Sequence, residues 1–205
     1  MLHVETVLPS TLDLLRELQS LPALSNMRLV GGTALALHLG HRTSVDLDLF
    51  GHFDPQKSFR KILLDAGHAA EGSESGEVQT LVVDGVKVDL VNYPYDWIAD
   101  AVFAESVILA GMDDIVAMKL SAAANRGRKK DFLDIATLLE RYSLAEMFER
   151  YQRKFAVTEI SYALRGLTYF DDAEDDPMPS MFASLTWNEA KMRIQNAMRE
   201  FVKFI

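Results

Sequence analysis

Three aspartates are the residues of this chain whose type and spacing could do chemistry: Asp46, Asp48 and Asp89. The first two alternate with apolar residues, and alternate side chains of a β-strand lie on one face. A second strand over residues 86–91, paired beside the first, would bring Asp89 to the same place. Three converging carboxylates repel one another unless a cation lies between them, and oxygen ligands suit Mg²⁺ or Mn²⁺. The pattern therefore predicts a divalent metal site, and its expected ligand is a nucleoside triphosphate.

A glycine pair precedes these carboxylates, in the sequence Gly31-Gly32-Thr33. It follows a short strand predicted over residues 28–30 and opens a helix predicted over residues 33–39. Glycines let a backbone approach a ligand closely, and the amides at a helix N-terminus favour an anion. We therefore expect these three residues to form a phosphate cradle.

The Asp-x-Asp pair also has an ordinary interpretation, because a lone pair of this kind is more often a solvated strand edge. The metal-site interpretation expects Val45, Leu47 and Leu49 to enter a core on the opposite face of the strand. The ordered set of glycine turn, carboxylate pair and third aspartate is much more specific than any one of them.

Arg42 and Ser44 lie between the glycine cradle and the carboxylates in sequence and could contact phosphates, although Arg42 could equally tie the loop together. His38 and His41 are three residues apart and could ligate a metal. A position at the end of the helix, where such side chains meet unpaired carbonyl groups, is the better interpretation of both histidines.

The composition indicates a soluble enzyme. With 205 residues and 49% apolar content, the chain can bury a substantial core in one domain or two closely packed halves. It contains no cysteine, which excludes disulfides and thiol nucleophiles and favours a reducing compartment. Neither a signal segment nor a membrane-spanning run is recognisable in the sequence, so we expect a cytoplasmic protein without membrane contact.

The net charge of −9 argues against broad, nonspecific binding of nucleic acids. The charge is uneven, because residues 112–170 carry a net charge of +2. That basic part is where a triphosphate or an RNA backbone could find cations. For Arg150, Arg153 and Lys154 we expect ordinary solvated helix faces.

Local patterns predict an α+β fold. Helices are predicted over residues 12–21, 33–39, 55–66, 96–104, 112–124, 130–142, 143–155 and 158–169, with a last helix that Thr186 and Glu189 cap and that ends at Phe204. Strands are predicted over residues 28–30, around the Asp-x-Asp pair, and over 78–83, 86–93 and 106–109, with Asp84-Gly85 as a hairpin turn. Residues 72–76 and 171–179 are predicted to be loops. A mixed sheet with helices in residues 1–111 would thus precede a helical region in residues 112–205, with the catalytic cleft between them.

The stretch from Gly31 to Phe50 resembles the signature of the AbiEii-type nucleotidyltransferases, which are the toxin halves of abortive-infection toxin-antitoxin systems within the polymerase-beta-like superfamily. A second block, residues 113–120 followed by 126–134, is similar to that family's helical Lys and Lys-Asp-x-x-Asp motifs. The resemblance covers roughly Arg28 to Leu139. One departure is that the superfamily's common Gly-Ser turn is Gly32-Thr33 here.

The resemblance implies a minimal nucleotidyltransferase fold and a role for each carboxylate. Asp46 and Asp48 would bridge one or two Mg²⁺ ions to the triphosphate, and Asp89 would bind the second ion and help to deprotonate the acceptor hydroxyl. Lys119, in an otherwise apolar helical run, must reach solvent, a carboxylate or a phosphate, and the resemblance favours phosphate.

The Lys-Asp-x-x-Asp block, Lys130, Asp131 and Asp134, would contact the nucleotide by the same resemblance. Two structural alternatives stay open. Asp131 could instead be a first-turn carboxylate matched to the helix dipole, and Asp134 could pair with Lys130 at i, i+4.

The function implied is transfer of a nucleoside monophosphate from an NTP to an acceptor hydroxyl, with Mg²⁺ or Mn²⁺ as cofactor. The acceptor would be the 3′ end of a tRNA or a protein, and an antitoxin would be encoded nearby. Two alternatives are a small-molecule adenylyltransferase of the antibiotic-modifying kind and a noncatalytic relative that binds a nucleotide or a partner.

Overall fold

The computed structural model describes residues 1–203, without the side chains of Ser75 and Arg126. The chain divides into two compact units. The first, here called the sheet unit, contains residues 1–95 and 100–110; the second, the helical unit, contains residues 96–99 and the chain from Gly111 onward. The sheet and the helices that follow it confirm the predicted α+β class.

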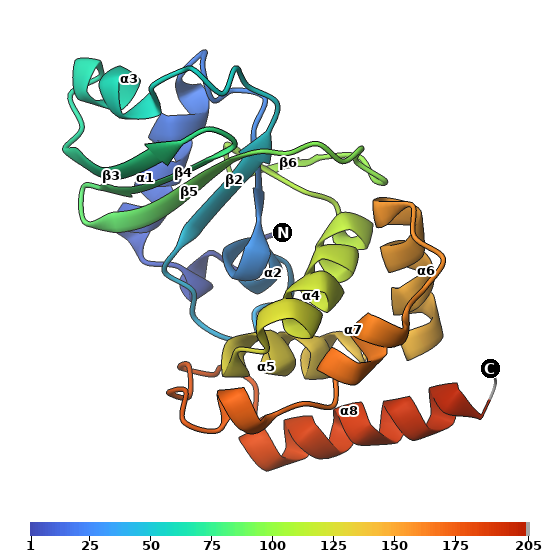
Figure 1. Ribbon diagram of the computed structural model, residues 1–205. Helices are drawn as coiled ribbons and strands as arrows, with labels where there is room; N and C mark the ends of the chain where they lie inside the picture. Colours follow the sequence, from blue (N-terminus) through green and yellow to red (C-terminus); the bar gives the residue numbers. More distant parts are fainter. Residues whose placement is uncertain (204–205) are drawn as a thin grey trace. The chain divides into compact units, whose positions relative to one another are not determined.

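The strands of the sheet unit form one mixed sheet (Figure 1). Within the described residues it has seven strands in the order β3-β4-β5-β2-β1-β7-β6. The strands are β1 (Arg28–Val30), β2 (Leu47–Gly51), β3 (Ala70–Ser75), β4 (Val78–Val83), β5 (Val86–Asn92), β6 (Val102–Ala104) and β7 (Val107–Leu109). The pairs β2–β5 and β1–β7 are parallel and the other neighbours are antiparallel. The sheet therefore places β2 and β5, the two strands that carry the aspartates, side by side.

Tight hairpins join neighbouring antiparallel strands of this sheet. Asp84 and Gly85, with φ values of +49° and +85°, join β4 to β5, as the Asp-Gly pair predicts. Glu105 and Ser106, with φ values of +54° and +63°, join β6 to β7 in the same way but without a glycine. The helix predicted over residues 96–104 is therefore wrong, whereas the strand predicted over residues 106–109 is confirmed as β7.

The loop predicted over residues 72–76 is also wrong, because most of it lies in β3 and pairs along β4. Gly72 explains how a glycine-rich segment can do so. Its φ is +143°, and a Cβ atom there would lie 2.2 Å from the carbonyl oxygen of Thr80. Glycine thus permits a close approach of the two strands rather than marking a loop.

The helices of the sheet unit are α1 (Pro9–Ser20), α2 (Gly31–Leu39) and α3 (Phe59–Asp65), after a short 3₁₀ turn, η1 (Val4–Thr6). α2 begins at Gly31, so the glycine pair forms its first residues instead of a separate turn. α3 begins later than predicted, because Ser58 caps it by accepting a hydrogen bond from the amide of Lys61. Figure 1 shows α3 beside β3 and β4, where the buried Phe59 and Leu63 join the core.

The helical unit consists of α4 (Met112–Arg126), α5 (Lys129–Leu138), α6 (Leu144–Phe155), α7 (Ser161–Gly166) and α8 (Trp187–Val202), with a 3₁₀ turn η2 (Asp171–Ala173). α4 packs against α6 and α7, and α8 packs against α5 (Figure 1). The predicted capping box of Thr186 and Glu189 is confirmed at the start of α8. Phe204, the predicted end of this helix, lies outside the described residues. α7 is shorter than the helix predicted over residues 158–169, and η2 lies within the loop predicted over residues 171–179.

Residues 96–99 are held in the helical unit by hydrogen bonds to their backbone. The amides of Ile98 and Ala99 each donate to the carboxylate of Asp114 at 3.0 Å. Lys154 Nζ lies 2.7 Å from the same carboxylate and donates to the carbonyl of Asp96 at 2.8 Å. The solvated helix face expected for Lys154 is therefore wrong, because its side chain is fully buried in an ion pair.

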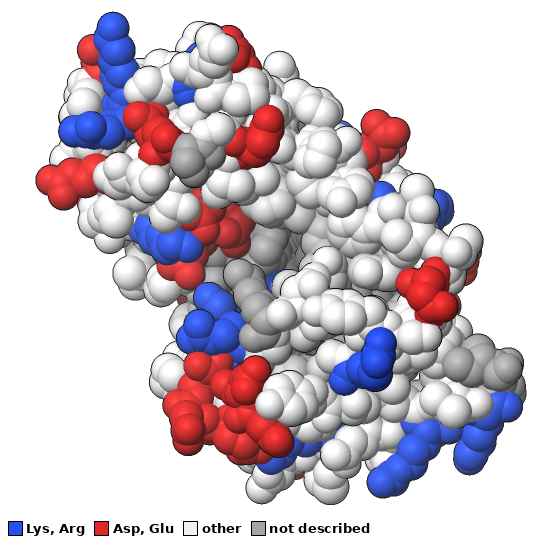
Figure 2. Space-filling view, in the orientation of Figure 1, with Lys and Arg blue, Asp and Glu red and all other residues white. Residues whose placement is uncertain are grey.

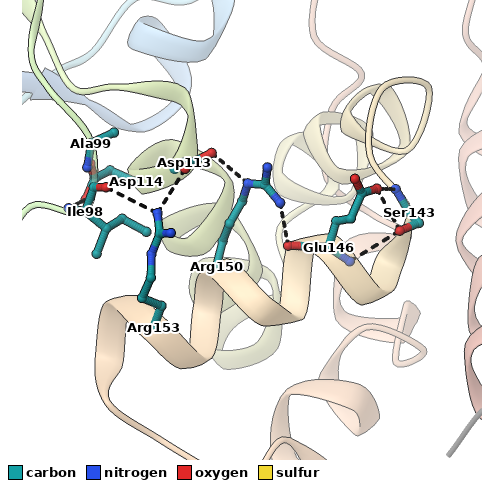
Figure 3. A network of polar contacts seen from close by, with 8 residues as sticks. All are labelled: Ile98, Ala99, Asp113, Asp114, Ser143, Glu146, Arg150 and Arg153. Carbon is teal, nitrogen blue, oxygen red and sulfur yellow. Dashed lines mark hydrogen bonds and ion pairs between the residues drawn. The ribbon is translucent and has the colours of Figure 1, made fainter.

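Two arginines of α6 converge on the neighbouring carboxylate of α4 (Figure 3). Arg150 Nε lies 2.7 Å from Asp113 Oδ1, and Arg153 Nη2 lies 3.0 Å from Asp113 Oδ2. Both arginines are more exposed than Lys154. These pairs give α4 and α6 a fixed register along the side that holds residues 96–99.

Candidate active site

The carboxylates of β2 and β5 lie side by side. Asp48 and Asp89 are register partners in the parallel pair of strands, and Asp46 directly precedes β2. The residues that alternate with them, Leu47, Leu49, Val88 and Leu90, are completely buried. The predicted pairing of a second strand that brings Asp89 beside Asp48 is therefore confirmed. Val45 is an exception to the predicted alternation, because it precedes β2 and is 58% exposed.

The start of α2 lies directly against this face. Gly31 has a φ of +71°, and a Cβ atom on it would lie 2.1 Å from Asp48 Oδ2. A Cβ atom on Gly32 would lie 2.5 Å from Arg42 Nη2 and 3.4 Å from Ser44 Oγ. The absence of side chains at both glycines thus lets the backbone approach a carboxylate and a guanidinium, which is the geometry expected at a phosphate cradle.

The loop between α2 and β2 is fixed by partly buried hydrogen bonds. The Thr33 hydroxyl lies 2.8 Å from Ser44 Oγ and also hydrogen-bonds to the carbonyl of Asp46. Arg42 is only 2% exposed, and its Nη1 donates to the carbonyl of Thr43 at 2.9 Å. Arg42 therefore ties the loop, which is one of the two interpretations of its sequence position. Phosphate contacts of Thr33, Arg42 and Ser44 stay predictions.

Lys87 is a site residue that sequence reasoning missed. Its Nζ lies 2.6 Å from Asp89 Oδ2. The hydrogen bond from Lys87 to Asp89 raises the pKa of the Lys87 amine, burial opposes that shift, and the charges of Asp89, Asp46 and Asp48 add to it. The ammonium therefore lies in the field of all three carboxylates. Its position two residues before Asp89 on a predicted strand was the available signal, since residues i and i+2 share a face.

The fit of a divalent metal to this site can be judged from its donors. Among residues 1–203, no three or more His, Cys, Asp or Glu side chains are grouped closely enough to hold a metal ion. The donors are nevertheless of the right kind: two carboxylates in register, a third two residues away, and Asp89 Oδ1, which is buried without a hydrogen-bond partner among the described atoms. The Lys87 ammonium already stands beside them as a cation. These oxygen donors are of the kind that a hard divalent ion prefers, and metal binding by them stays a prediction.

Lys119, Asp131 and Asp134 meet inside the helical unit. Lys119 Nζ lies 3.1 Å from Asp131 Oδ1 and 2.6 Å from Asp134 Oδ2, and these side chains are 5%, 0% and 0% exposed. Of the partners weighed for Lys119, a carboxylate is the one observed. Asp134 pairs with Lys119. Lys130 is exposed near the start of α5. A phosphate contact of these four residues stays a prediction.

The histidines lie at the end of α2, as expected. His38 is in the last turn, where its Nε2 lies 3.2 Å from the carbonyl oxygen of Ala110. Burial lowers the pKa of His38, and the hydrogen bond with Ala110 opposes this shift. Gly40 caps the helix with a φ of +69°, and His41 is buried just beyond it.

Residues 13–96 match the family model described as the nucleotidyl transferase AbiEii toxin of a type IV TA system. This match supports nucleotidyltransferase activity for the chain. The matched region contains Gly31, Gly32 and all three aspartates, so the predicted resemblance to AbiEii toxins is confirmed where the candidate site lies.

Relatives along nearly the whole chain agree with this fold. An uncharacterized protein of Aquifex aeolicus (strain VF5) is 26% identical over 93% of this chain and 95% of its own length. A candidate nucleotidyltransferase from Helicobacter pylori has a TM-score of 0.59 at 18% identity and covers 97% of this chain and 99% of its own. The nucleotidyltransferase toxin MenT4 of Mycobacterium tuberculosis H37Rv has a TM-score of 0.58 at 13% identity, and the match covers 92% of this chain and 79% of the MenT4 chain. At these identities the two structures support the fold alone.

Proposed function

We propose that this protein moves a nucleoside monophosphate from an NTP to an acceptor hydroxyl, with attack on the α-phosphate and release of pyrophosphate. We also propose that it acts as the toxin of a type IV toxin-antitoxin pair. The observation that carries the proposal is the meeting of Asp48, Asp89 and the start of α2 at one point of the sheet. A carboxylate pair beside close-approaching backbone amides suits a metal-bound triphosphate.

Each group of the sheet unit has a separate task in this proposal. Asp46, Asp48 and Asp89 would hold Mg²⁺ or Mn²⁺, which when bound would neutralise phosphate charge and polarise the attacked phosphorus. The backbone at Gly31 and Gly32 would receive phosphate oxygens, and Asp89 would accept the proton of the acceptor hydroxyl. Catalysis would then rest on positioning and charge neutralisation, with no covalent intermediate on the protein.

The helical unit contributes a scaffold in this proposal. Lys119, Asp131 and Asp134 join α4 to α5 through buried ion pairs. That these three residues and Lys130 also contact the nucleotide is expected from the family resemblance. Among the described residues no helix is both long and apolar enough to span a membrane.

The proposal is tested by transfer of label from each of the four α-³²P NTPs, with Mg²⁺, to either total cellular RNA or RNA-depleted protein. We expect the wild type to label one of these fractions with one NTP, and Asp89→Asn to label neither. Asp100→Asn, which removes an exposed carboxylate elsewhere in the sheet unit, is the matched control and should retain labelling.

The two acceptor fractions separate an RNA acceptor from a protein acceptor, and EDTA tests the metal. If no NTP labels either fraction while the protein still binds nucleotide, the noncatalytic alternative replaces this proposal. Growth arrest on expression of the wild type, absent with Asp48→Ala, tests the toxin role separately.

A further inference from the structure

Lys87 lies beside one of the predicted metal ligands, Asp89. It shares a face of β5 with Asp89, and its Nζ lies 2.6 Å from Asp89 Oδ2. The Lys87 side chain is 48% exposed and that of Asp89 is 20% exposed, so the pair lies on the open face of the sheet. The register partners of these two residues on β4 are Val82 and Thr80, neither of which carries a charge.

The ammonium and a divalent ion compete for the same carboxylate, in which Lys87 binds Oδ2 and Oδ1 has no hydrogen-bond partner among the described atoms. Asp89 Oδ2 is occupied by Lys87, and a metal bound to it would place two like charges within a few ångströms of each other. The three carboxylates also repel one another, and Lys87, whose charge interacts favourably with all three, offsets part of this repulsion in the absence of metal. Repulsion between the two cations therefore favours departure of the ammonium from Asp89 when the metal enters.

We infer that Lys87 is an internal counter-cation of the carboxylate site, which stabilises the site without metal and is displaced from Asp89 when a divalent ion binds. The inference rests on the proposed function, because it takes the three aspartates as metal ligands. The Lys87 side chain is 48% exposed, so water can solvate the displaced ammonium, and a triphosphate would offer it an anion as well. A metal–nucleotide complex should therefore bind more favourably than the free metal ion.

The test compares metal binding without nucleotide in three variants of the full chain. Lys87→Gln removes the charge, Lys87→Arg keeps it, and Lys61→Gln removes an exposed charge from α3 as the matched control. Calorimetric titration with Mn²⁺ alone should show Lys87→Gln binding about tenfold more tightly than the wild type, because one nearby positive charge is gone. Lys87→Arg and Lys61→Gln should bind like the wild type.

Thermal melts in EDTA give a second measurement that does not depend on turnover. Lys87→Gln should melt below the wild type, since the carboxylates lose their counter-cation, and Mn²⁺ should raise its melting temperature more than that of the wild type. Lys87→Thr, a neutral residue that favours strands, is the second variant if Lys87→Gln does not fold.

The outcomes separate this inference from the proposed function. Equal or weaker Mn²⁺ binding by Lys87→Gln, with normal labelling by the wild type, would overturn the role of Lys87 alone. Failure of every protein to bind Mn²⁺, with or without NTP, would overturn both proposals. Tighter Mn²⁺ binding by Lys87→Gln supports the inference even where no acceptor is labelled.

Discussion

Replacing Lys119 by methionine tests the buried ion triad of the helical unit. Methionine keeps the length and apolar character of the side chain but removes the ammonium that lies 3.1 Å from Asp131 and 2.6 Å from Asp134. Both carboxylates are completely buried, so neither can regain water without local unfolding. The variant leaves two negative charges together where the wild type has two negative charges and one positive charge.

Removing one partner of a buried ion pair lowers the free energy of unfolding by about 3–5 kcal/mol. Lys119→Met removes a cation that two carboxylates share, so we expect a loss in the upper part of this range, about 4–5 kcal/mol. In a chain of this size each kcal/mol lowers the melting temperature by about 2–4 °C, which gives a fall of about 8–20 °C. Asp134→Asn should cost less, about 1.5–3 kcal/mol, because Lys119 and Asp131 remain as a pair of opposite charges.

Calorimetric melts of both variants, each with and without Mg-NTP, measure these differences. Lys191→Met is the matched control in the same unit, because its ammonium pairs with Glu174 at the surface and such pairs contribute about 0–1 kcal/mol. The scaffold role would be refuted if Lys119→Met had the same melting temperature as the Lys191→Met control but gained no stability from Mg-NTP. It would instead show that Lys119 acts on phosphate.

Three further predictions concern single contacts. Gly31→Ala should lose transfer activity and about 1–3 kcal/mol of stability, because the new methyl group would collide with Asp48 and the alanine would have a strained φ. Gly76→Ala is the control, because Gly76 has a φ of +57° but open space around it, so an alanine there is strained without a collision. An equal loss of activity in both variants would contradict this explanation. Burial lowers the pKa of His38 from 6.5, so the unfolded chain binds a proton that the folded chain resists, and stability should fall as pH drops below 6.5. Urea denaturation at about pH 7.5 and about pH 5.5 should show a smaller fall for His38→Gln than for the wild type, and an identical fall would be evidence against this effect. Lys154→Met should speed hydrogen exchange at the amides of Ile98 and Ala99, measured by mass spectrometry, because Asp114 loses its buried cation; unchanged exchange would mean that Asp114 holds the segment alone.

Features set by nearby residues were predictable from the sequence. The hairpin at Asp84-Gly85 follows from the backbone preferences of two adjacent residues. The start of α8 follows from a capping box that spans four residues, Thr186 to Glu189. The alternation of aspartates with apolar residues placed Asp48 and Asp89 on one face, and the pairing of β2 with β5 confirmed it. The same rule, applied to Lys87, would have found the counter-cation.

Features set by distant residues were not predictable. Residues 72–76 look like a loop because glycine and serine favour loops locally, but pairing with β4 overrides that preference. The position of residues 96–99 depends on Asp114 and Lys154, which lie far along the chain. The burial of Lys154 has the same cause, since α6 gives no local sign that its lysine faces a carboxylate on α4.

The chain leaves the sheet unit at residues 96–99 and returns to it at residues 100–110, so no single continuous stretch of sequence forms the complete sheet. The family match ends at residue 96, yet β7 still has to return and pair with β1 through Leu29 and Leu109. A fragment that stops at the end of the match would leave β1 with an open edge, which is prone to pair with another molecule. On the ribosome the same edge stays open until residues 100–110 emerge, so this is the stage at which the nascent chain is most exposed to misassembly and at which a binding partner could protect it.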